Sequence, residues 1–545
     1  MDRRQLLLSS LVAGVTVACA SDNSDNSGDG GKDGSKESTT TQGPVELAAP
    51  KPADLADSAF LLGVASGDPE SDRVMLWTRV FPADASTTDS IEVAVDVARD
   101  ESFTDLIVSQ ITKAGADLAH SVHVDVTGLD PDTWYYYRFR AGDQTSVVAR
   151  TRTFPKADAK VEAFNFVFAS CQDFQWGYYG AWASAAQTKD LDAIVFLGDY
   201  IYEMTLGDLS PDQSGARVWG DSGALTLSDY RGRYTQAKAD PNLQAAHHAV
   251  PWIITFDDHE VSDNYAGDVG GSDLEEPKSR DRRLAAYQAW YEHTPIRLKT
   301  PPEGTSPEDF DDLTVNRGFS FGDLANMFVI ETRQHADPPS CRTTAGYSAD
   351  EGPLCDDAAN PDRSNLGTDQ EKWLFGELEA TKALWNILAN PVMLADMNIG
   401  SAAEPKYYRD MWIGYPAARE RLLAKVTESK VSNPVVVTGD WHASFVLDVQ
   451  SDPHGDSPKT VLPEFLVSSI SSVLFPQDYQ ENNPQIRYFK AAHGYALVRV
   501  TREQMVCEFS YIDDVWDPDA RVTSVDRFSL AAGDLTPKFE GSVTL

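Results

Sequence analysis

Residue types that bind metal ions follow four separate apolar runs of this chain. Each run has the length and composition of a buried strand, and polar residues follow each one at once. The polar residues at these four ends are Cys171, then Asp199 with Tyr202, then Asp258 with His259 and Asn264, and finally Asp440 with His442. Because ligands of open α/β sheets bind beyond the carboxyl ends of the strands, we expect these side chains to meet at one sheet edge.

The chemistry of this set is that of a metal centre. Thiolate, carboxylate, phenolate, amide and imidazole groups together could hold two or more cations. Phenolate and thiolate favour trivalent iron, and carboxylate and amide oxygens suit calcium or magnesium, although the same side chains would accept zinc or manganese. Clustered metals beside a phosphate polarise it, supply a bridging hydroxide as nucleophile and stabilise the leaving oxygen. Each segment alone is equally consistent with a capping aspartate or a core histidine, but the four together predict a metallohydrolase.

The elements that must position these residues have an α/β rhythm. The spacing from Cys171 to Asp199, with a helical stretch at 181–188 between them, fits one βαβ unit. Further strands are expected at 252–256, 326–330, 392–394 and 434–439, and helices at 279–293, from Thr368 onward, and at 417–426. Ser279 and Thr368 are the expected caps of two of these helices.

Residues 57–155 have a different pattern, that of an all-β domain. Apolar and polar residues alternate at 91–97 and 123–126. Leu129-Asp130-Pro131-Asp132-Thr133 then leads into a tyrosine-rich strand, an arrangement that resembles the corner of fibronectin-type sandwiches, where a tyrosine hydroxyl ties down a backbone carbonyl. We therefore expect a small fibronectin-like β-sandwich with a structural role, in which His120 and His123 face solvent.

Composition excludes one class of function. The 545 residues include 46 Lys and Arg against 84 Asp and Glu, which gives a formal net charge of −38. A nucleic-acid binder normally carries a basic patch, so no nucleic-acid partner is expected. The length is sufficient for two domains with large cores.

The N-terminus is expected to be a targeting segment. Arg3-Arg4 precede an apolar run at 6–18 that is short for a membrane span, and the pair resembles a twin-arginine export signal. Thr16-Val17-Ala18-Cys19 resembles a lipobox with Thr in place of the usual Leu, in which Cys19 would be lipidated. We therefore assign residues 1–19 to a signal peptide and the Ser-, Asp- and Gly-rich residues 20–56 to a tether.

The remaining cysteines are expected to play two roles. Cys341 and Cys355 bracket an Asp-, Pro- and Gly-rich stretch, and we predict a disulfide between them, as export would permit. Cys507 lies in an alternating, strand-like segment and is predicted to be a buried thiol.

Several motifs give the chain a family resemblance. They are 62–69 (LGVASGDP) and 76–79 (LWTR) in the β domain, and 169–172 (ASCQ), 198–203 (GDYIYE), 257–261 (DDHEV) and 439–442 (GDWH) beyond it. Together they resemble the PhoD-type alkaline phosphatases, calcium-dependent members of the metallophosphoesterase superfamily. The resemblance covers nearly everything after the tether. It implies a four-layer αββα catalytic domain, here at 160–545, preceded by the β-sandwich domain.

The resemblance also implies a set of ions and ligands. The family's site holds one ferric ion (Fe3+) and two calcium ions (Ca2+). By motif position, the residues that resemble iron ligands are Cys171, Asp199, Tyr202, Asp440 and His442. Asp199 would also bridge to calcium, with Asp258 and Asn264 on the calcium side, and His259 resembles a phosphate contact or proton donor. The catalytic pair is thus expected to be His259 and Asp199, and Arg333 is either a phosphate-side group or part of a structural ion pair.

These inferences predict an exported phosphatase, periplasmic or extracellular and monomeric. It would hydrolyse small-molecule phosphomonoesters, and diesters as a second class, by metal-hydroxide attack. Its expected partners are the twin-arginine export machinery and, through a lipid on Cys19, the membrane. One alternative is a phosphodiesterase or phospholipase D of the same family, and a non-enzymatic alternative is a surface lipoprotein that only holds metal.

Overall fold

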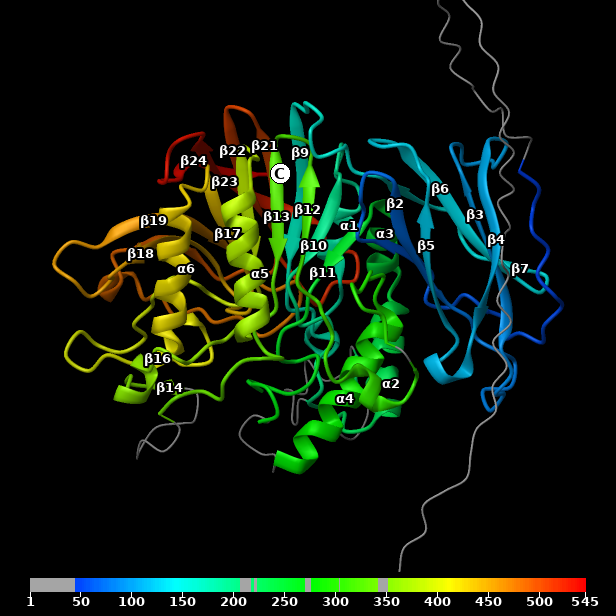
Figure 1. Ribbon diagram of the computed structural model, residues 1–545, viewed down its shortest axis with the longest axis horizontal. Helices are drawn as coiled ribbons and strands as arrows, with labels where there is room; N and C mark the ends of the chain where they lie inside the picture. The colour runs from blue at the N-terminus through cyan, green and yellow to red at the C-terminus, as the bar shows by residue number, and fades with distance from the viewer. Residues whose placement is uncertain (1–44, 206–216, 220–222, 270–275, 303, 342–350) are drawn as a thin grey trace, which may run out of the picture. The chain divides into compact units, whose positions relative to one another are not determined.

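Residues 45–545 are described by the structure, a computed structural model, with gaps at 206–216, 220–222, 270–275, 303 and 342–350. The predicted signal peptide, the predicted lipidation site and most of the predicted tether therefore lie outside the described residues. Two large sheets and one smaller one carry the fold (Figure 1). Within the described part, no helix is long and apolar enough to cross a membrane.

The first large sheet has parallel strands at its centre. These are β9 (Ala163–Ala169), β10 (Ala193–Phe196) and β11 (Trp252–Ile254), and α1 (Gly180–Ala185) lies between β9 and β10 in the chain. The βαβ unit expected between Cys171 and Asp199 is thus confirmed. The antiparallel strands that extend the sheet beyond β9 are β21 (Gly494–Thr501), β22 (Gln504–Ile512), β23 (Val522–Ala531) and β24 (Lys538–Thr544).

The second large sheet also has a parallel centre. Its parallel strands are β13 (Ala325–Val329), β15 (Trp385–Ala389), β17 (Pro434–Thr438) and β19 (Lys459–Leu466), and its antiparallel strands are β12 (Arg317–Phe321), β18 (Ser444–Ser451) and β20 (Ile486–Lys490). The prediction of a strand at 392–394 was wrong, because the strand is β15. The apolar residues that follow it are buried in irregular backbone, where the amide N–H groups of Leu394 and Ala395 donate to the Glu464 carboxylate at 3.0 and 2.7 Å.

Helices cover the outer faces of both sheets, and apolar side chains fill the space between the sheets. Phe166, Val195, Ile387 and Val437 are among the inner-face residues of this central core. The first sheet packs against α1, α2 (Leu227–Lys238), α3 (Pro241–Ala249) and α4 (Glu276–His293), and the second packs against α5 (Gly367–Ala380) and α6 (Pro416–Glu428). Figure 1 shows α5 and α6 lying over the strands of the second sheet. The layers are therefore αββα, as predicted.

Two predicted helix caps are wrong by a few residues. α4 begins at Glu276, before Ser279, and α5 begins at Gly367, so Thr368 lies inside its first turn. The hydrophobic periodicity located both helices, but helix ends depend on local backbone geometry that the periodicity does not contain.

The N-terminal β-sandwich shares a sheet with the αββα layers. One of its sheets contains β3 (Ile91–Ala98), β4 (Leu106–Ala114), β6 (Trp134–Ala141), β7 (Gln144–Thr145) and β8 (Ala149–Arg152). The facing sheet contains β1 (Val64–Gly67), β2 (Arg73–Arg79) and β5 (Ser121–Thr127), and an apolar core lies between the two. β1 also pairs in parallel with β11, at Gly67 opposite Trp252, which joins this facing sheet to the first large sheet.

The predicted tyrosine corner is present with a different hydrogen bond. The hydroxyl of Tyr135 accepts from the backbone N–H of Asp130 at 2.8 Å, where we had expected it to donate to a carbonyl. The last residues of the predicted tether, 45–56, also lie along the sandwich. The Ala48 N–H donates to Ser109 Oγ at 2.8 Å, and Leu55 bridges to Pro82. Hydrogen bonds to the sandwich thus order this Ala- and Pro-containing stretch, which has no apolar periodicity to reveal it.

The two histidines expected to face solvent are packed instead. His120 is buried, with Nδ1 3.2 Å from the Ala114 carbonyl oxygen. His123 stacks on Tyr291 at 4.5 Å between ring centroids, and its Nε2 lies 2.9 Å from the Thr294 carbonyl oxygen. The reason is that the end of α4 covers this face of β5, a long-range contact that alternation along one strand cannot reveal.

Both cysteine predictions are confirmed. Cys341 and Cys355 form a disulfide, and Cys507 in β22 is a buried thiol. The disulfide lies near a short two-stranded sheet made by β14 (Glu351–Gly352) and β16 (Tyr407–Tyr408). Arg409 ties the two regions together, because its guanidinium donates to the Cys341 carbonyl oxygen at 3.2 Å.

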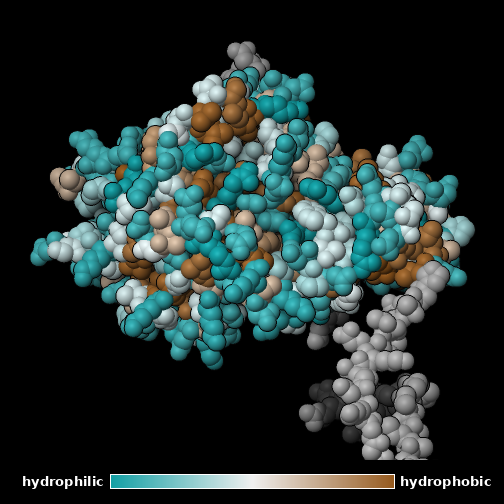
Figure 2. Space-filling view, turned by 90° about the horizontal axis from the view of Figure 1, so that it is seen from above, coloured by the Kyte–Doolittle hydropathy of each residue, from teal (hydrophilic) through white to brown (hydrophobic). Residues whose placement is uncertain are grey.

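Figure 2 shows one face of the molecule, on which hydrophobic residues form separate patches between hydrophilic ones. This agrees with the strongly acidic composition of the chain.

Candidate metal centre

The carboxyl ends of β9, β10, β11 and β17 bring the predicted site residues together. Three groups of donor atoms each lie within 4.8 Å of one another. These groups are Cys171 with Asp199 and His442, Asp199 with Asp258 and His259, and Asp257 with Asp258 and Asp440. Asp199 and Asp258 each belong to two groups, so the three form one continuous cluster.

Tyr202 and Asn264, the other two predicted ligands, lie against this cluster. The Tyr202 hydroxyl donates to Asp199 Oδ2 at 3.0 Å and lies 3.1 Å from His442 Nε2. The backbone N–H of Asn264 donates to Asp258 Oδ2 at 2.6 Å. All the residues that the sequence singled out for the site therefore converge, although their roles as ligands stay a prediction.

Several of these residues have left-handed backbone conformations, which are rare outside glycine. The φ angles are 60° at Cys171, 59° at Asp199, 52° at Asn264, 68° at Asp440 and 53° at His442. Each such residue costs of order 1–3 kcal/mol and persists only where the surroundings over-determine it. Such residues are enriched at functional sites, and five of the fifteen in the described part of the chain belong to the predicted ligand set.

Gly198 allows two of the strand ends to approach each other closely. Its φ is +116°, and a Cβ at this position would lie 2.5 Å from the backbone nitrogen of Asp257. Only glycine fits there. The buried carboxylate of Glu260 then holds the two turns, because it accepts from the N–H groups of Asp199 at 3.0 Å, Tyr200 at 2.7 Å and Asp257 at 2.9 Å.

The buried carboxylates of the cluster favour bound cations. Burial raises the pKa of Asp199 and of Asp440 well above the ordinary range, and Asp257 and Asp258 raise both further. Burial and the Asp199 charge likewise raise the pKa of the Cys171 thiol. Oδ1 of Asp258 is buried and accepts no hydrogen bond from any described residue. Bound cations would offset this charge and occupy this oxygen, so the donor set fits metal ions.

Arg333 is part of a structural ion pair. It is buried, and its guanidinium lies 2.5 Å from Asp257, 3.3 Å from Asp410 and 3.7 Å from Asp258. Burial alone would lower its pKa, but the three carboxylates outweigh burial and raise the pKa. Of the two roles considered for Arg333, the structure therefore supports the ion pair.

His259 is oriented for contact with a ligand of the cluster. Its Nδ1 lies 2.8 Å from Glu203 Oε2, and its ring stacks on Tyr202 at 4.2 Å. Burial alone would lower the pKa of His259, but the carboxylates of Asp258, Glu203 and Asp199 outweigh it and raise this pKa well above its usual value. Glu203 thus fixes one ring nitrogen, and the other, Nε2, lies 3.8 Å from Oδ1 of Asp263, a residue that lines the adjoining hollow with His259.

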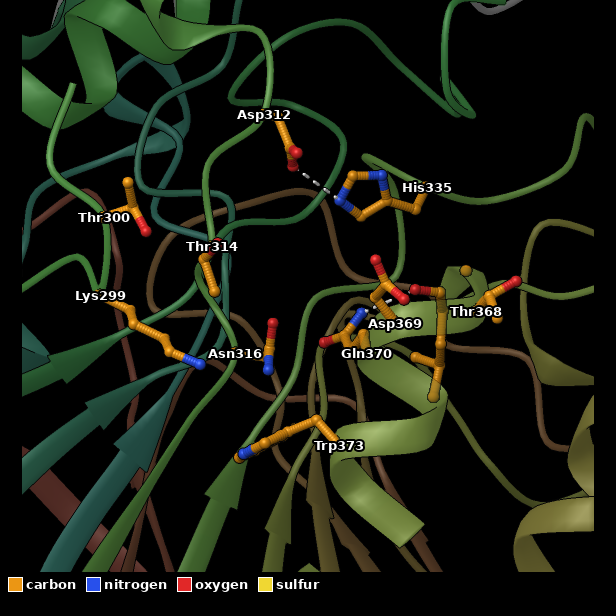
Figure 3. A pocket seen from close by; sticks show the side chains of 12 residues that line it. Lys299, Thr300, Asp312, Thr314, Asn316, His335, Thr368, Asp369, Gln370 and Trp373 are labelled. Carbon is orange, nitrogen blue, oxygen red and sulfur yellow. Dashed lines mark hydrogen bonds and ion pairs between the residues drawn. The ribbon is translucent and has the colours of Figure 1, made fainter. Parts of the chain in front are cut away.

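A small hollow of about 140 Å³ adjoins the cluster and is lined by Asp199, Asp258, His259, Asn264, Asp440 and His442 among others. A wider hollow of about 510 Å³ lies beside the first turn of α5 (Figure 3). Figure 3 shows Lys299 and Asn316 on one side of it, Asp369 on the other and Trp373 below. None of its lining residues belongs to a donor group found in the described part of the chain, so we place the chemistry in the smaller hollow.

Sequence reasoning missed several residues that support the site. Glu203 and Glu260 lie inside the motifs 198–203 and 257–261, and their position beside the predicted ligands was the available signal. Asp410 had no such signal, because it lies in irregular backbone. The serine-rich stretch 468–472 runs beside β9, where the N–H of Ser471 donates to the Cys171 carbonyl oxygen at 3.3 Å.

Comparison with known proteins agrees with this site. Residues 166–509 match the PhoD-like phosphatase family, and residues 46–155 match the PhoD-like phosphatase N-terminal domain. Alkaline phosphatase D of Bacillus subtilis (strain 168) is 38% identical over 480 residues, which cover 86% of this chain and 80% of that protein. The solved structure of PhoD superposes with a TM-score of 0.84 at 37% identity and covers 90% of this chain and 94% of its own.

A weaker likeness is that to GAP50, the anchor in the inner membrane complex of Plasmodium. It has a TM-score of 0.33 at 10% identity, over 64% of this chain and 85% of its own, and this value is too low to support an argument. The family matches, the relative and the PhoD structure all agree with the strand-end motifs. The chain belongs to the PhoD-like phosphatases and is a hydrolase of phosphoric esters.

Proposed function

We propose that this phosphatase releases phosphate from small-molecule phosphomonoesters at a centre of one ferric and two calcium ions. Iron would be held by the donor groups of Cys171, Asp199, Tyr202, Asp440 and His442. Calcium would be held by Asp199, Asp258 and Asn264. The observation that carries the proposal is the single cluster formed by the four strand ends, in which soft and hard donors share Asp199.

The bound ions would polarise the phosphoryl group and lower the pKa of water at the site. The chain's own residues would position the ester. His259, held through Nδ1 by Glu203, lines the hollow and would contact the phosphate or protonate the leaving oxygen. Asp199 would act as the bridge between the two kinds of ion, and Glu260 fixes its backbone.

The first test is hydrolysis of an aryl phosphomonoester and of the matching diester, with calcium present and again after chelation. We expect calcium-dependent turnover that favours the monoester. Preference for the diester would move the assignment to a phosphodiesterase or phospholipase D. No turnover of either ester by iron-loaded protein would leave a protein that only holds metal.

The iron assignment has a matched pair of variants, because the described part of the chain has two buried free thiols. Cys171→Ser should lose bound iron and activity, whereas Cys507→Ser, in the middle of β22, should keep both. Iron content measured by elemental analysis gives a result that is independent of turnover. A Cys171→Ser protein with full iron content would refute the ligand set.

We also propose that the protein is exported through the twin-arginine route and works outside the cytoplasm, as a monomer attached to the membrane by a lipid on Cys19. The support is the resemblance of Arg3-Arg4 and its apolar run to a twin-arginine signal, and that of Thr16-Val17-Ala18-Cys19 to a lipobox with Thr in place of the usual Leu. Cys19→Ser should move the protein from the membrane fraction to the soluble exported fraction. Replacing Arg3-Arg4 by two lysines should leave the protein inside the cell. Sedimentation of the soluble variant reports the oligomeric state.

A further inference from the structure

The hollow beside the metal cluster has one wall that does not match its polar chemistry. Besides the carboxylates, Asn264 and the two histidines, it is lined by Tyr408, Met411, Trp441 and Phe475. Tyr408 and Trp441 meet edge to face at 5.1 Å between ring centroids. None of these four side chains is a member of the donor groups. A purely metal-binding role for the hollow therefore leaves this wall unexplained.

Phe475 differs from the rest of the wall in its exposure. Its relative exposure is 41%, against 7% for Met411 and 3% for Trp441. It is nevertheless held in place, because its ring stacks on His442 at 5.1 Å with 21° between the planes, and its backbone N–H lies 3.4 Å from the His442 carbonyl oxygen. An aromatic ring fixed at the rim of a catalytic hollow, with one part open to water, is able to bind an apolar group.

The size of the hollow indicates which part of the substrate meets this ring. Its volume of about 140 Å³ is below the roughly 300–1,000 Å³ of pockets that enclose a whole drug-sized ligand. It can take the phosphoryl group, but a larger organic group of the ester has to extend past the rim. The exposed Phe475 lines that rim.

We propose that Phe475, with Tyr408 beside the hollow, is the specificity determinant that binds the organic group of the ester and favours flat, apolar groups next to the phosphate. This rests on the proposed phosphatase function and adds a substrate class to it. The ring contributes only to binding of the organic group. Its removal should therefore affect esters with an aromatic group and spare those with a small polar one.

The experiment compares Phe475→Ala with the wild type, as full-length metal-loaded enzymes, on 4-nitrophenyl phosphate and on glycerol phosphate. Each ester is compared with itself between enzymes, so the reactivity of its leaving group cancels. We expect kcat/KM for the aryl ester to fall about tenfold, with less than a twofold change for glycerol phosphate. Phe475→Tyr, which keeps a ring, should restore the preference.

A binding measurement separates recognition from chemistry. Phenylphosphonate and methylphosphonate differ only in the organic group, and calorimetric titration should show that Phe475→Ala weakens the first about tenfold and the second less than twofold. Phe539→Ala is the control, because Phe539 is another exposed phenylalanine, 54% accessible, on the edge strand β24. Metal content is measured in every variant, since Phe475 touches His442.

The outcomes distinguish this inference from the function on which it rests. Equal losses on both esters, or no loss on either, would overturn the role of Phe475 while leaving the phosphatase intact. An aryl-selective loss in both kinetics and phosphonate binding would support it. A wild-type enzyme that hydrolyses neither ester would overturn the proposed function itself.

Discussion

Replacing Glu260 tests whether buried backbone hydrogen bonds hold the metal cluster. This carboxylate is fully buried and accepts three backbone N–H groups, from Asp199, Tyr200 and Asp257, at 2.7–3.0 Å. Glu260→Ala leaves these donors without an acceptor. Each buried donor left unsatisfied costs about 1–3 kcal/mol. If water entering the vacated space satisfies part of this demand, the net loss is about 4 kcal/mol.

This loss converts into a measurable shift of the unfolding midpoint. At about 2.1 cal/mol/K per residue, roughly 500 folded residues have an unfolding entropy of about 1 kcal/mol/K. A loss of about 4 kcal/mol therefore lowers Tm by about 4 °C. Glu260→Gln keeps one accepting oxygen but turns an N–H group toward an N–H donor. We expect Glu260→Gln to lose about half as much stability as Glu260→Ala.

The assay is differential scanning calorimetry combined with elemental analysis of bound metal. Glu101→Ala serves as the control, because Glu101 is exposed and far along the chain from the cluster. We expect Glu260→Ala to lose metal as well as stability, since the turn that carries Asp199 is no longer fixed. A Glu260→Ala protein with wild-type Tm and full metal content would refute the reasoning that these hydrogen bonds shape the site.

Three further changes test other parts of the fold. Tyr135→Phe should lower the free energy of unfolding by about 1 kcal/mol in a urea titration, because it leaves the N–H of Asp130 without its 2.8 Å partner. An unchanged midpoint would mean that this hydrogen bond does not stabilise the protein. Arg333→Met should cost about 3–5 kcal/mol in the same assay, because it leaves buried carboxylates without their cation, and a stabilised variant would contradict this. Asp396, 2.8 Å from His454, raises the pKa of His454 above its unfolded value of about 6.5. The stabilisation by protonated His454 is therefore complete below about pH 6.5 and is lost as the pH rises through the pKa of His454 in the folded protein. His454→Gln should thus destabilise the protein at pH 5 and not at pH 8.5.

The strand ends that carry the site could be predicted because their signal is local. A short apolar run followed at once by Asp199, or by Asp440, is readable from neighbouring residues alone. The same holds for the βαβ spacing and for the alternation in the sandwich. Where the local signal was weak, as in the apolar residues 392–394, the prediction failed, since three apolar residues bury equally well in a strand or in a loop.

What could not be predicted depends on contacts between distant segments. β1 pairs with β11 across about 190 positions of sequence, and nothing in either strand specifies the other. His123 is covered by α4 for the same reason. Asp410 joins the Arg333 ion pair from an irregular segment without periodicity. The side chains of such residues suit many environments, and only the assembled fold determines which environment each one occupies.

The residues of the site with left-handed backbone lie where the local strand-end signals and the contacts between distant segments meet. Cys171, Asp199, Asn264, Asp440 and His442 all have φ between 52° and 68°. At about 1–3 kcal/mol each, their combined strain is of order 5–15 kcal/mol, comparable to the whole net stability of a typical protein. Ten other described residues besides glycine also have positive φ, Phe103 and Lys430 among them, so such conformations are not confined to the site. Here, however, five such residues fall in the predicted ligand set, where they help to bring the donor atoms of neighbouring strand ends together.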